Sequence, residues 1–339
     1  MNSTEWTAGV VAGTGTAGYS GDGTPATGAQ LNNPFDLTFL PDKSLVFSDT
    51  FNHRIRRIDA VSGTIATLCG TGEKGFSGDA GPAARARLNE PYGVVADRLG
   101  RVFFADRLNR RVRAIDAAGI VTTLAGDGSG LSGGDGGPAA QAGLAEPNGL
   151  ALSLDQTRLF IADVAGHRVR AVDLSRGTID TVAGTGEARH DGDGGPATRA
   201  AIFGPRAVAV APDGSLYVTE RQGSCIRRIR NGTIATVAGT GARGYAGDGG
   251  DARQAVFDAP KEMAVDPDGN IYVVDTENNA IRLIDAKTWI ITTIACGLAR
   301  PHGAAVAPDG SVLVGDSEHH RVIRLVRPPN RKFTPPPAA

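Results

Sequence analysis

Six pairs of residues, each directly after a proline, contain the side chains of this sequence that are best suited to chemistry. The pairs are Phe35-Asp36, Tyr92-Gly93, Asn148-Gly149, Arg206-Ala207, Lys261-Glu262 and His302-Gly303. Glycine or alanine is the second member of four pairs, and a carboxylate stands there only at Asp36 and Glu262. Residues that depart from a repeated pattern are candidates for function, because residues that follow the pattern are explained by the fold.

These side chains could bind an anion and move a proton near neutral pH. Arg206 and Lys261 would hold a carboxylate of the substrate, and His302 or Glu262 would act as acid or base. We therefore expect the catalytic residues to be His302, Glu262, Lys261, Arg206 and Asp36, and the substrate-binding residues to be Tyr92, Asn148 and Phe35. The alternative is a salt-bridged plug that seals a channel.

A metal ion is a second possibility for the same residues. One histidine and two carboxylates, His302, Asp36 and Glu262, suit several divalent metals, so the expected cofactor is unknown or a divalent ion. Five glycine-rich loops each carry one regularly placed aspartate, at Asp22, Asp79, Asp135, Asp193 and Asp248. Calcium needs six to eight oxygen ligands, so we interpret these aspartates as Asx-type turn residues instead.

A repeat positions the six pairs. The prolines before them are Pro34, Pro91, Pro147, Pro205, Pro260 and Pro301, at spacings of 57, 56, 58, 55 and 41 residues. Each unit reads as four short strands separated by turns such as "APDG", which predicts an all-β, six-bladed propeller. The sixth unit lacks a fourth strand, and residues 6–13, "WTAGVVAG", align with residues 63–70, "GTIATLCG", and so can supply it.

The stretches "NHRI" at 52–55, "GHRV" at 166–169 and "HHRV" at 319–322 resemble the NHL-repeat family of β-propellers. The resemblance extends from residue 6 to about 327, so residues 1–327 are the expected domain and the proline-rich residues 328–339 a disordered tail. It implies that His53 and His167 are structural. One member, the peptidyl-α-hydroxyglycine α-amidating lyase, is similar in placing zinc-ligating histidines directly after such prolines, but only His302 matches here, so its three-histidine site is not supported.

The fifth connection between units, "CGLARPH", is shorter than the others by roughly 16 residues, judged from the 41-residue spacing. If the long connections form a wall around the mouth of the central channel, the missing one leaves a gap between blades five and six. We expect a ligand to enter there. The alternative is that one blade has lost a surface insertion.

The charge of the chain limits the kinds of binding partner that can be expected. The net charge is −1 and no block of like charges occurs, which argues against nucleic acid and membrane surfaces. No secretory signal is recognisable at the N-terminus, so a cytoplasmic location is expected. A closed propeller needs no partner to cover a sheet edge, so a monomer is expected. Cys69, Cys225 and Cys296 are expected to be buried free thiols.

Two functions stay open: a lyase or hydrolase acting on a small polar or anionic molecule at the channel mouth, or a non-catalytic propeller serving as a protein- or ligand-binding scaffold.

Overall fold

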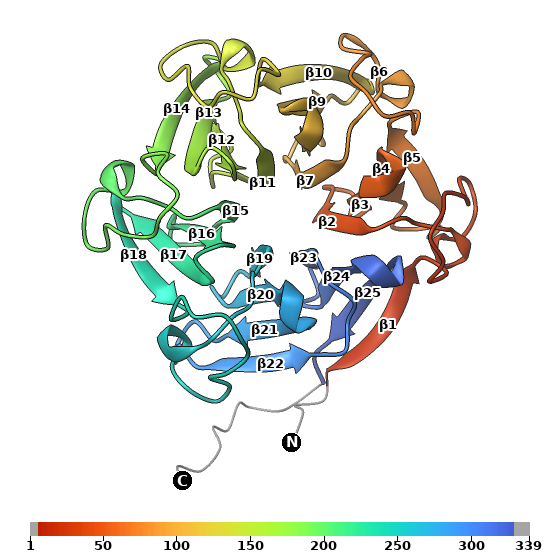
Figure 1. Cartoon of the computed structure of the whole chain (residues 1–339). Helices are drawn as coiled ribbons and strands as arrows, with labels where there is room; N and C mark the ends of the chain where they lie inside the picture. Colours follow the sequence, from red (N-terminus) through yellow and green to blue (C-terminus); the bar gives the residue numbers. More distant parts are fainter. Residues whose placement is uncertain (1–5, 329–339) are drawn as a thin grey trace.

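The computed structural model describes residues 6–328, which form a ring of six four-stranded blades (Figure 1). The strands of each blade are given from the centre to the rim. Blade one consists of β2 (Pro34–Phe39), β3 (Leu45–Asp49), β4 (Arg54–Ile58) and β5 (Ile65–Cys69), and blade two of β7 (Pro91–Ala96), β8 (Val102–Asp106), β9 (Arg111–Ile115) and β10 (Ile120–Ala125). Blade three consists of β11 (Pro147–Leu152), β12 (Arg158–Asp163), β13 (Arg168–Asp173) and β14 (Thr178–Ala183), and blade four of β15 (Pro205–Val210), β16 (Leu216–Glu220), β17 (Cys225–Arg230) and β18 (Thr233–Ala238). Blade five consists of β19 (Glu262–Val265), β20 (Ile271–Asp275), β21 (Ala280–Ile284) and β22 (Ile291–Ala295), and blade six of β23 (Gly303–Val306), β24 (Val312–Asp316), β25 (Arg321–Val326) and β1 (Thr7–Ala12).

The remaining elements are short. The two-residue strand β6 (Gly81–Pro82) pairs with β10 at the rim of blade two. Single-turn 3₁₀ helices lie in the long connections between blades: η1 (Ala26–Gly28), η3 (Ala83–Arg85), η5 (Ala139–Gln141), η6 (Ala197–Arg199) and η7 (Ala252–Gln254). Others follow the second strand of a blade: η2 (Thr50–Asn52), η4 (Arg107–Asn109), η8 (Thr276–Asn278) and η9 (Ser317–His319).

The turns are specified by local chemistry. In the turn between β19 and β20, the Asp266 carboxylate accepts hydrogen bonds from the backbone of Asp268 and Asn270, and Gly269 has φ of +88°. A glycine adopts that left-handed conformation without steric cost. Asn231 and Gly232 both have positive φ between β17 and β18, as a tight hairpin requires.

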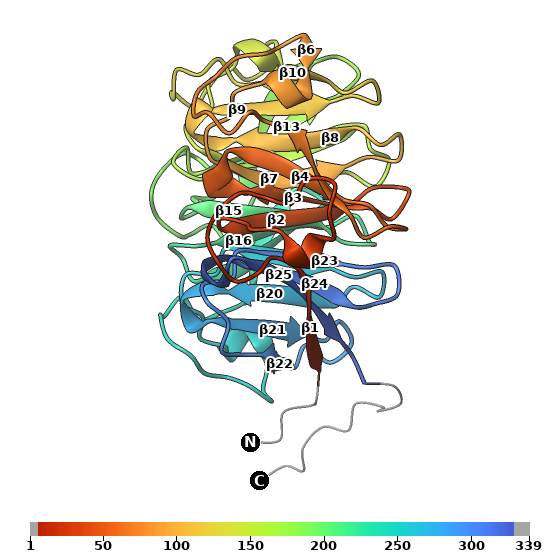
Figure 2. The same ribbon diagram turned by 90° about the vertical axis from the view of Figure 1, so that its right-hand side faces the viewer.

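The N-terminal strand closes the ring, as predicted. β1 pairs antiparallel with β25, with Thr7 opposite Val326 and Ala8 opposite Leu325. Figures 1 and 2 both place β1 at the outer side of β25, so the first and last strands of the chain lie side by side. Closure leaves no blade with a missing outer strand, which is how propellers limit exposed sheet edges.

The hydrophobic core is a set of six clusters, each between two neighbouring blades. Between blades four and five, for example, Ile226 and Tyr217 pack with Val273 and Ile284 around the buried Phe257. Similar clusters occupy the other five junctions. Because each blade packs on both neighbours, the positions of the first strands around the centre are fixed by the whole ring.

A buried arginine on the third strand fastens each long connection to its blade. The five arginines are fully buried: Arg56, Arg113, Arg170, Arg227 and Arg282. Each pairs at 2.5–2.7 Å with the aspartate of the preceding connection, namely Asp22, Asp79, Asp135, Asp193 and Asp248. The interpretation of these aspartates as Asx-turn residues was therefore wrong, since their carboxylates accept from arginines rather than from their own turns.

Blade six is the exception. Its preceding connection is the short one and contains no such aspartate, and Ile323 stands where the other blades have the buried arginine. Ile323 packs in the hydrophobic cluster between blades five and six. The aspartate that ends its second strand, Asp316, pairs instead with Arg321 at 2.8 Å and with His319 at 2.9 Å.

The histidines of the repeat motif are structural, as predicted. His53 has φ of 51° and His167 has φ of 50°. The Nδ1 atom of His53 accepts a hydrogen bond from the backbone N–H of Glu90, and that of His167 accepts from Gly204. Each imidazole thus holds the start of the next blade.

The cysteine expectation is partly wrong. Cys69 and Cys225 are buried, but Cys296 is exposed. Cys69 pairs with Ile55, and in blade five the equivalent partner of Ile281 is Ala295. Cys296 is therefore one residue beyond the buried position.

Within residues 6–328, no helix has the length and apolar character needed to cross a bilayer. The tail expected over 328–339 lies outside the described residues, apart from Pro328.

Candidate functional site

The first member of each post-proline pair lies buried at the centre of the ring. Phe35, Tyr92, Asn148, Arg206, Lys261 and His302 are all at most 7% exposed. The Phe35 ring stacks on the His302 imidazole, with centroids 4.0 Å apart, and meets the edge of Tyr92 at 4.9 Å. We call these six side chains the central plug.

The His302 imidazole has both nitrogens engaged. Nδ1 lies 2.7 Å from the carbonyl oxygen of Arg300, and Nε2 lies 3.0 Å from Nζ of Lys261. Because a carbonyl oxygen only accepts, Nδ1 carries the proton and Nε2 accepts from lysine. Burial holds the pKa of His302 well below its usual value, and the charges of Lys261 and Arg206 act in the same direction. The imidazole is therefore neutral.

Lys261 is the cation at the heart of the plug. Its Nζ lies 3.2 Å from Oε1 of Glu277. Burial lowers the pKa of Lys261 to about 7, and repulsion by Arg300 and Arg206 opposes the stabilising carboxylate of Glu277. Lys261 is thus poised between its charged and neutral forms at neutral pH even with Glu277 beside it, so a further anion would favour the charged form.

Arg206 and Tyr92 form the opposite side of the plug. The Arg206 guanidinium lies 4.3 Å from the Tyr92 ring centroid, and its Nε donates to the Tyr92 hydroxyl at 3.3 Å. Its ion pair with Glu146 is long, at 3.7 Å. Asn148 donates through Nδ2 to the Glu146 carbonyl, whereas its Oδ1 is buried without a hydrogen-bond partner.

A further arginine, Arg221, lies beside the plug and was not anticipated. At this position Thr50, Thr276 and Ser317 donate a hydroxyl to the proline carbonyl of the next blade. Arg221 is half-buried, and no ion pair to it occurs within residues 6–328. Burial and the charge of Arg206 lower its pKa. Arg107 and Val164 also lack the hydroxyl at this position, but Arg107 pairs with Glu90 and Glu146. The two arginines at this position were a signal that sequence reasoning could have used.

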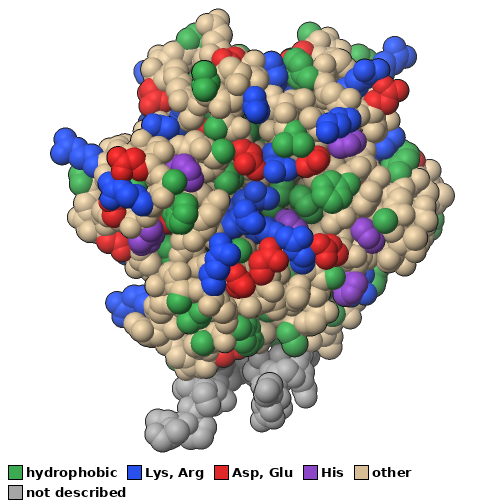
Figure 3. Space-filling view, in the orientation of Figure 1, with side chains coloured by type: hydrophobic (Ala, Val, Ile, Leu, Met, Phe, Trp, Pro, Cys, Tyr) green, Lys and Arg blue, Asp and Glu red, His purple; other side chains and the backbone are tan. Residues whose placement is uncertain are grey.

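Figure 3 shows the face of the ring that bears the connections between blades. Lysine and arginine side chains gather over its centre, with carboxylates beside them. The groups around the plug are five cations, Arg107, Arg206, Arg221, Lys261 and Arg300, and four carboxylates, Glu90, Glu146, Glu277 and Glu318. The four arginines balance the four carboxylates, and Lys261 adds one positive charge to this mouth when it is protonated.

Asp36 and Glu262 lie on the other side of the plug. Both line a cavity of about 470 Å³ that runs between the first strands of all six blades, whereas no plug residue lines it. Asp36 accepts from the backbone N–H of Val94 and of Leu37, both at 2.8 Å. Successive residues of a strand point in opposite directions, so in the pairs that contain Asp36 and Glu262 the first member belongs to the plug, whereas the second member faces the cavity.

These two carboxyl groups hold protons unusually well. Burial raises the pKa of Asp36 to about 7. Burial, aided by the negative charge of Asp36, raises the pKa of Glu262 well above its usual value. Oε1 of Glu262 accepts from the backbone of Met263 at 3.1 Å, and Oε2 is buried without a partner. The cavity therefore has a proton donor with one unsatisfied oxygen.

The eight predicted site residues are thus divided into two groups. His302, Lys261, Arg206, Tyr92, Phe35 and Asn148 form the plug, and Asp36 and Glu262 face the cavity. His302, Asp36 and Glu262 do not bring three ligand atoms within 4.8 Å of one another; the one such group among residues 6–328 lies in blade four. A metal held by His302, Asp36 and Glu262 stays a prediction that this geometry does not support.

The short connection before blade six contains an ion-pair network. Arg300 pairs with Glu277 through two nitrogens, at 2.9 and 3.2 Å, and with Glu318 at 3.0 Å. These side chains are a third to a half exposed, so their net contribution to stability is small. Ligand entry at this junction stays a prediction.

The fold and the repeat together define the class of protein: a six-bladed β-propeller. The chain belongs to the NHL-repeat family. The model of the teneurin NHL domain matches residues 57–133 and 240–298, and that of the NHL repeat matches residues 298–325.

Two relatives match most of the propeller. The protein SUPPRESSOR OF QUENCHING 1, chloroplastic, of Arabidopsis thaliana is 29% identical over 269 residues, covering 76% of this chain and 25% of its own length. Teneurin-1 of Mus musculus is 28% identical over 279 residues, covering 71% of this chain and 10% of its own. The chain thus spans a quarter or less of these curated relatives.

Solved structures share the fold at low sequence identity. A protein of unknown function from Bacteroides thetaiotaomicron has a TM-score of 0.70 at 16% identity, covering 95% of this chain and 76% of its own. A gluconolactonase from Xanthomonas campestris scores 0.60 at 16%, covering 88% and 87%. A virginiamycin B lyase from Staphylococcus aureus scores 0.53 at 17%, covering 86% and 79%. Such identities speak for the fold alone.

Proposed function

We propose that the protein binds a small anionic molecule at the mouth of the central channel, on the face that bears the connections between blades. One observation carries the proposal: Arg221 is a half-buried guanidinium beside Arg206, with no ion-pair partner among the described residues. A desolvated cation next to another cation is unfavourable by itself, so an arriving carboxylate or phosphate would relieve the repulsion and gain charge-assisted hydrogen bonds.

Lys261 supports the same site. Its pKa of about 7 means that it binds its proton weakly in the free protein. An anion at the mouth would favour the ammonium form, so ligand binding would be accompanied by uptake of part of a proton at neutral pH. Arg206 acts on both groups, because its charge lowers the pKa of Lys261 and of Arg221.

Binding is a better account of the mouth than catalysis by His302. Both imidazole nitrogens are occupied, and the ring is stacked on Phe35. A general base needs a free nitrogen within reach of the proton it removes. A monomer that recognises a small molecule, rather than nucleic acid or a membrane, is part of this proposal.

A second candidate is catalysis of the lyase or hydrolase type inside the channel. The observation that favours it is the pair Asp36 and Glu262, which face the cavity with raised pKa values and one unsatisfied oxygen. A carboxyl group that keeps its proton near neutral pH can act as a general acid. The known enzymes among the structural neighbours make this chemistry compatible with the fold. Its substrate would be a small polar molecule entering the bore.

Calorimetric titration with malonate tests the first candidate. Arg221→Gln should weaken malonate binding at least about 10-fold, because a hydrogen bond to a charged group contributes about 1.5–3 kcal/mol. The control is Arg253→Gln, an arginine that is paired with Asp251 in the exposed connection before blade five. Equal affinities for the wild type and Arg221→Gln would contradict an anion site at the mouth.

A further inference from the structure

Blade four differs from blades one, two and five at a set of positions that touch one another. In blades one, two and five, an aromatic residue of the connection, Tyr19, Phe76 or Tyr245, lies over the guanidinium of a third-strand arginine. In the same blades an asparagine, Asn52, Asn109 or Asn278, donates to the aspartate that ends the second strand, at 2.8–2.9 Å. Together these contacts fasten the connection to the blade.

Blade four replaces all of these groups at once. Counted from the aspartate of the connection, His190 stands where the aromatic residue is expected, and Glu220 stands in place of the aspartate. Gly223 replaces the asparagine, and Cys225 replaces the first arginine of the third strand. A Cβ atom at Gly223 would lie 2.6 Å from Oε2 of Glu220, and one at Gly166 in blade three would lie 2.3 Å from Oδ2 of Asp163, so a glycine at this position lets the carboxylate approach the backbone in both blades. Blade three already has Ser132 and Gly166 at two of these positions, and blade five has Ala280 in place of the first arginine, so what is particular to blade four is the combination of His190, Glu220 and Cys225.

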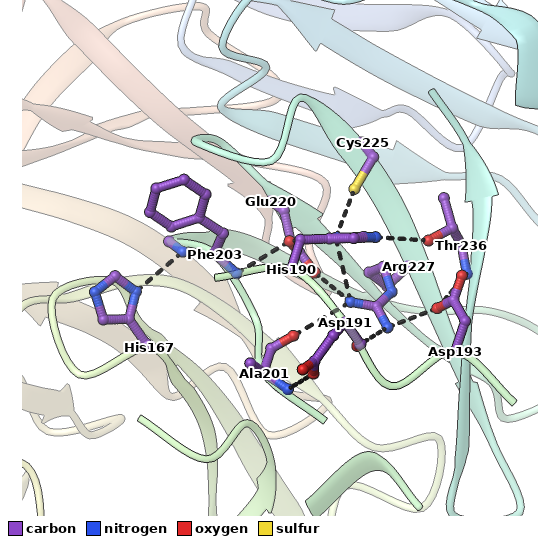
Figure 4. Close-up of polar contacts among 11 residues, drawn as sticks. His167, His190, Asp191, Asp193, Ala201, Phe203, Glu220, Cys225, Arg227 and Thr236 are labelled. Carbon is purple, nitrogen blue, oxygen red and sulfur yellow. Dashed lines mark hydrogen bonds and ion pairs between the residues drawn. The ribbon is translucent and has the colours of Figure 1, made fainter. Parts of the chain in front are cut away.

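The new side chains converge on one point (Figure 4). Nδ1 of His190 lies 2.9 Å from Oε2 of Glu220 and 3.6 Å from Sγ of Cys225. All three atoms lie within 4.8 Å of one another. A tetrahedral zinc ion with bonds of about 2.0–2.3 Å places its ligand atoms about 3.3–3.6 Å apart. The 3.6 Å edge matches this spacing, whereas the 2.9 Å edge is shorter by about 0.4 Å, so a small outward movement of His190 or Glu220 would be needed to form one face of such a tetrahedron.

A hydrogen-bonded catalytic relay does not fit the same contacts. In a cysteine–histidine–carboxylate relay, the thiol and the carboxylate contact different nitrogens of the imidazole. Here both contact Nδ1, and Nε2 faces the hydroxyl of Thr236 at 3.3 Å. Convergence of sulfur, oxygen and nitrogen on a common point is instead the arrangement of metal ligands.

We infer that His190, Glu220 and Cys225 bind one divalent metal ion of the zinc class, with the fourth position open to water. Nitrogen, oxygen and sulfur together suit zinc or cobalt better than calcium or magnesium, which take oxygen ligands. Glu220 and Cys225 are buried, whereas the His190 side chain is 35% exposed and gives the ion its entry. The metal would fasten the connection that carries His190 to blade four.

The groups around the site define its charge balance. Arg227 donates to Oε1 of Glu220 at 2.7 Å, and it also pairs with Asp193 at 2.6 Å. Its Nη1 atom lies 3.4 Å from Nδ1 of His190, so the guanidinium would have to move away from that nitrogen when the metal binds. Oε2 of Glu220 accepts from the backbone of Phe203 at 3.0 Å. Arg227 thus orients the carboxylate and leaves Oε2 toward the metal, as outer-shell partners do. A thiolate and a carboxylate neutralise the ion, and Asp193 neutralises Arg227, so no net charge is left in the site.

The test is titration of the full chain, stripped with a chelator, by Zn²⁺ and by Co²⁺. We expect one equivalent of Zn²⁺ to bind, and Co²⁺ to give a thiolate-to-cobalt charge-transfer band. Cys225→Ser should abolish the band and weaken Zn²⁺ at least about 10-fold. His190→Tyr restores the aromatic residue of the other blades, so it should fold normally and also lose the metal. Cys296→Ser, which changes an exposed thiol, is the matched control.

Two results would overturn the inference. One is the absence of stoichiometric Zn²⁺ binding by the folded wild type. The other is binding that survives in both Cys225→Ser and His190→Tyr, or that is lost in Cys296→Ser, since the ion would then lie elsewhere. Neither result bears on the anion site at the mouth, which shares no residue with this cluster.

Discussion

Replacing one buried arginine of the repeat should destabilise the whole ring. In Arg282→Met, the guanidinium loses its bonds to the carbonyl oxygens of Ala246 and Val256, at 2.8 and 3.1 Å, and its ion pair with Asp248 at 2.7 Å. Asp275, fully buried and 3.6 Å away, is left without this counter-charge. Breaking a buried ion pair in this way costs about 3–5 kcal/mol.

The expected change in thermal stability follows from the size of the domain. An entropy of unfolding of about 0.7 kcal/mol/K for a chain of this length converts 3–5 kcal/mol into a decrease in Tm of about 4–7 °C. Differential scanning calorimetry measures it directly. The control, Arg253→Met, removes an exposed arginine and should change Tm by less than about 1 °C. Equal Tm changes in the two variants would refute the view that buried arginines fasten the connections.

Three further outcomes are expected. The contribution of Asp36 and Glu262 to stability should fall as the pH rises from about 4 to about 7, because the folded protein holds protons that the unfolded chain has already lost, whereas His302, with its lowered pKa, acts in the opposite direction; thermal unfolding at several pH values should therefore show Glu262→Gln gaining stability relative to the wild type as the pH rises, and a constant difference would contradict this. Malonate affinity should fall between about pH 6.5 and pH 8.5 as Lys261 loses its proton, and calorimetry should find a flatter profile for Lys261→Met, whereas an unchanged profile would exclude Lys261 from the site. Gly303→Ala should lower Tm by several degrees, because its Cβ would lie 2.1 Å from the Phe35 carbonyl oxygen, while Gly28→Ala, which meets nothing within 4 Å, should leave Tm nearly unchanged.

The sequence was sufficient to predict the ring because each blade repeats the same local pattern. The regular prolines identified the first strands, and the alignment of residues 6–13 with residues 63–70 identified the closing strand. In a repeat fold each unit contacts mainly its neighbours, so one correctly interpreted unit determines the others. The position of the six post-proline residues at the centre followed from the same reasoning.

Contacts across loops could not be predicted in this way. Asp22 and its equivalents seemed isolated because their partner arginines lie 34 or 35 residues later, on a strand that the connection folds back upon. The separation of Asp36 and Glu262 from the plug depends on the alternation of side chains along a strand, which the grouping into pairs disregarded. Arg221 was missed because it follows the second strand rather than a proline.

The most direct test of the central proposal is a crystal structure of the protein grown with malonate. We predict density for one malonate at the mouth, within hydrogen-bond distance of the Arg221 guanidinium and close to Arg206 and Lys261. The contradicting result is a mouth that holds no malonate, with Arg221 paired to a carboxylate of the protein itself. The plug would then be a seal only, and the search for a ligand would move to the cavity lined by Asp36 and Glu262.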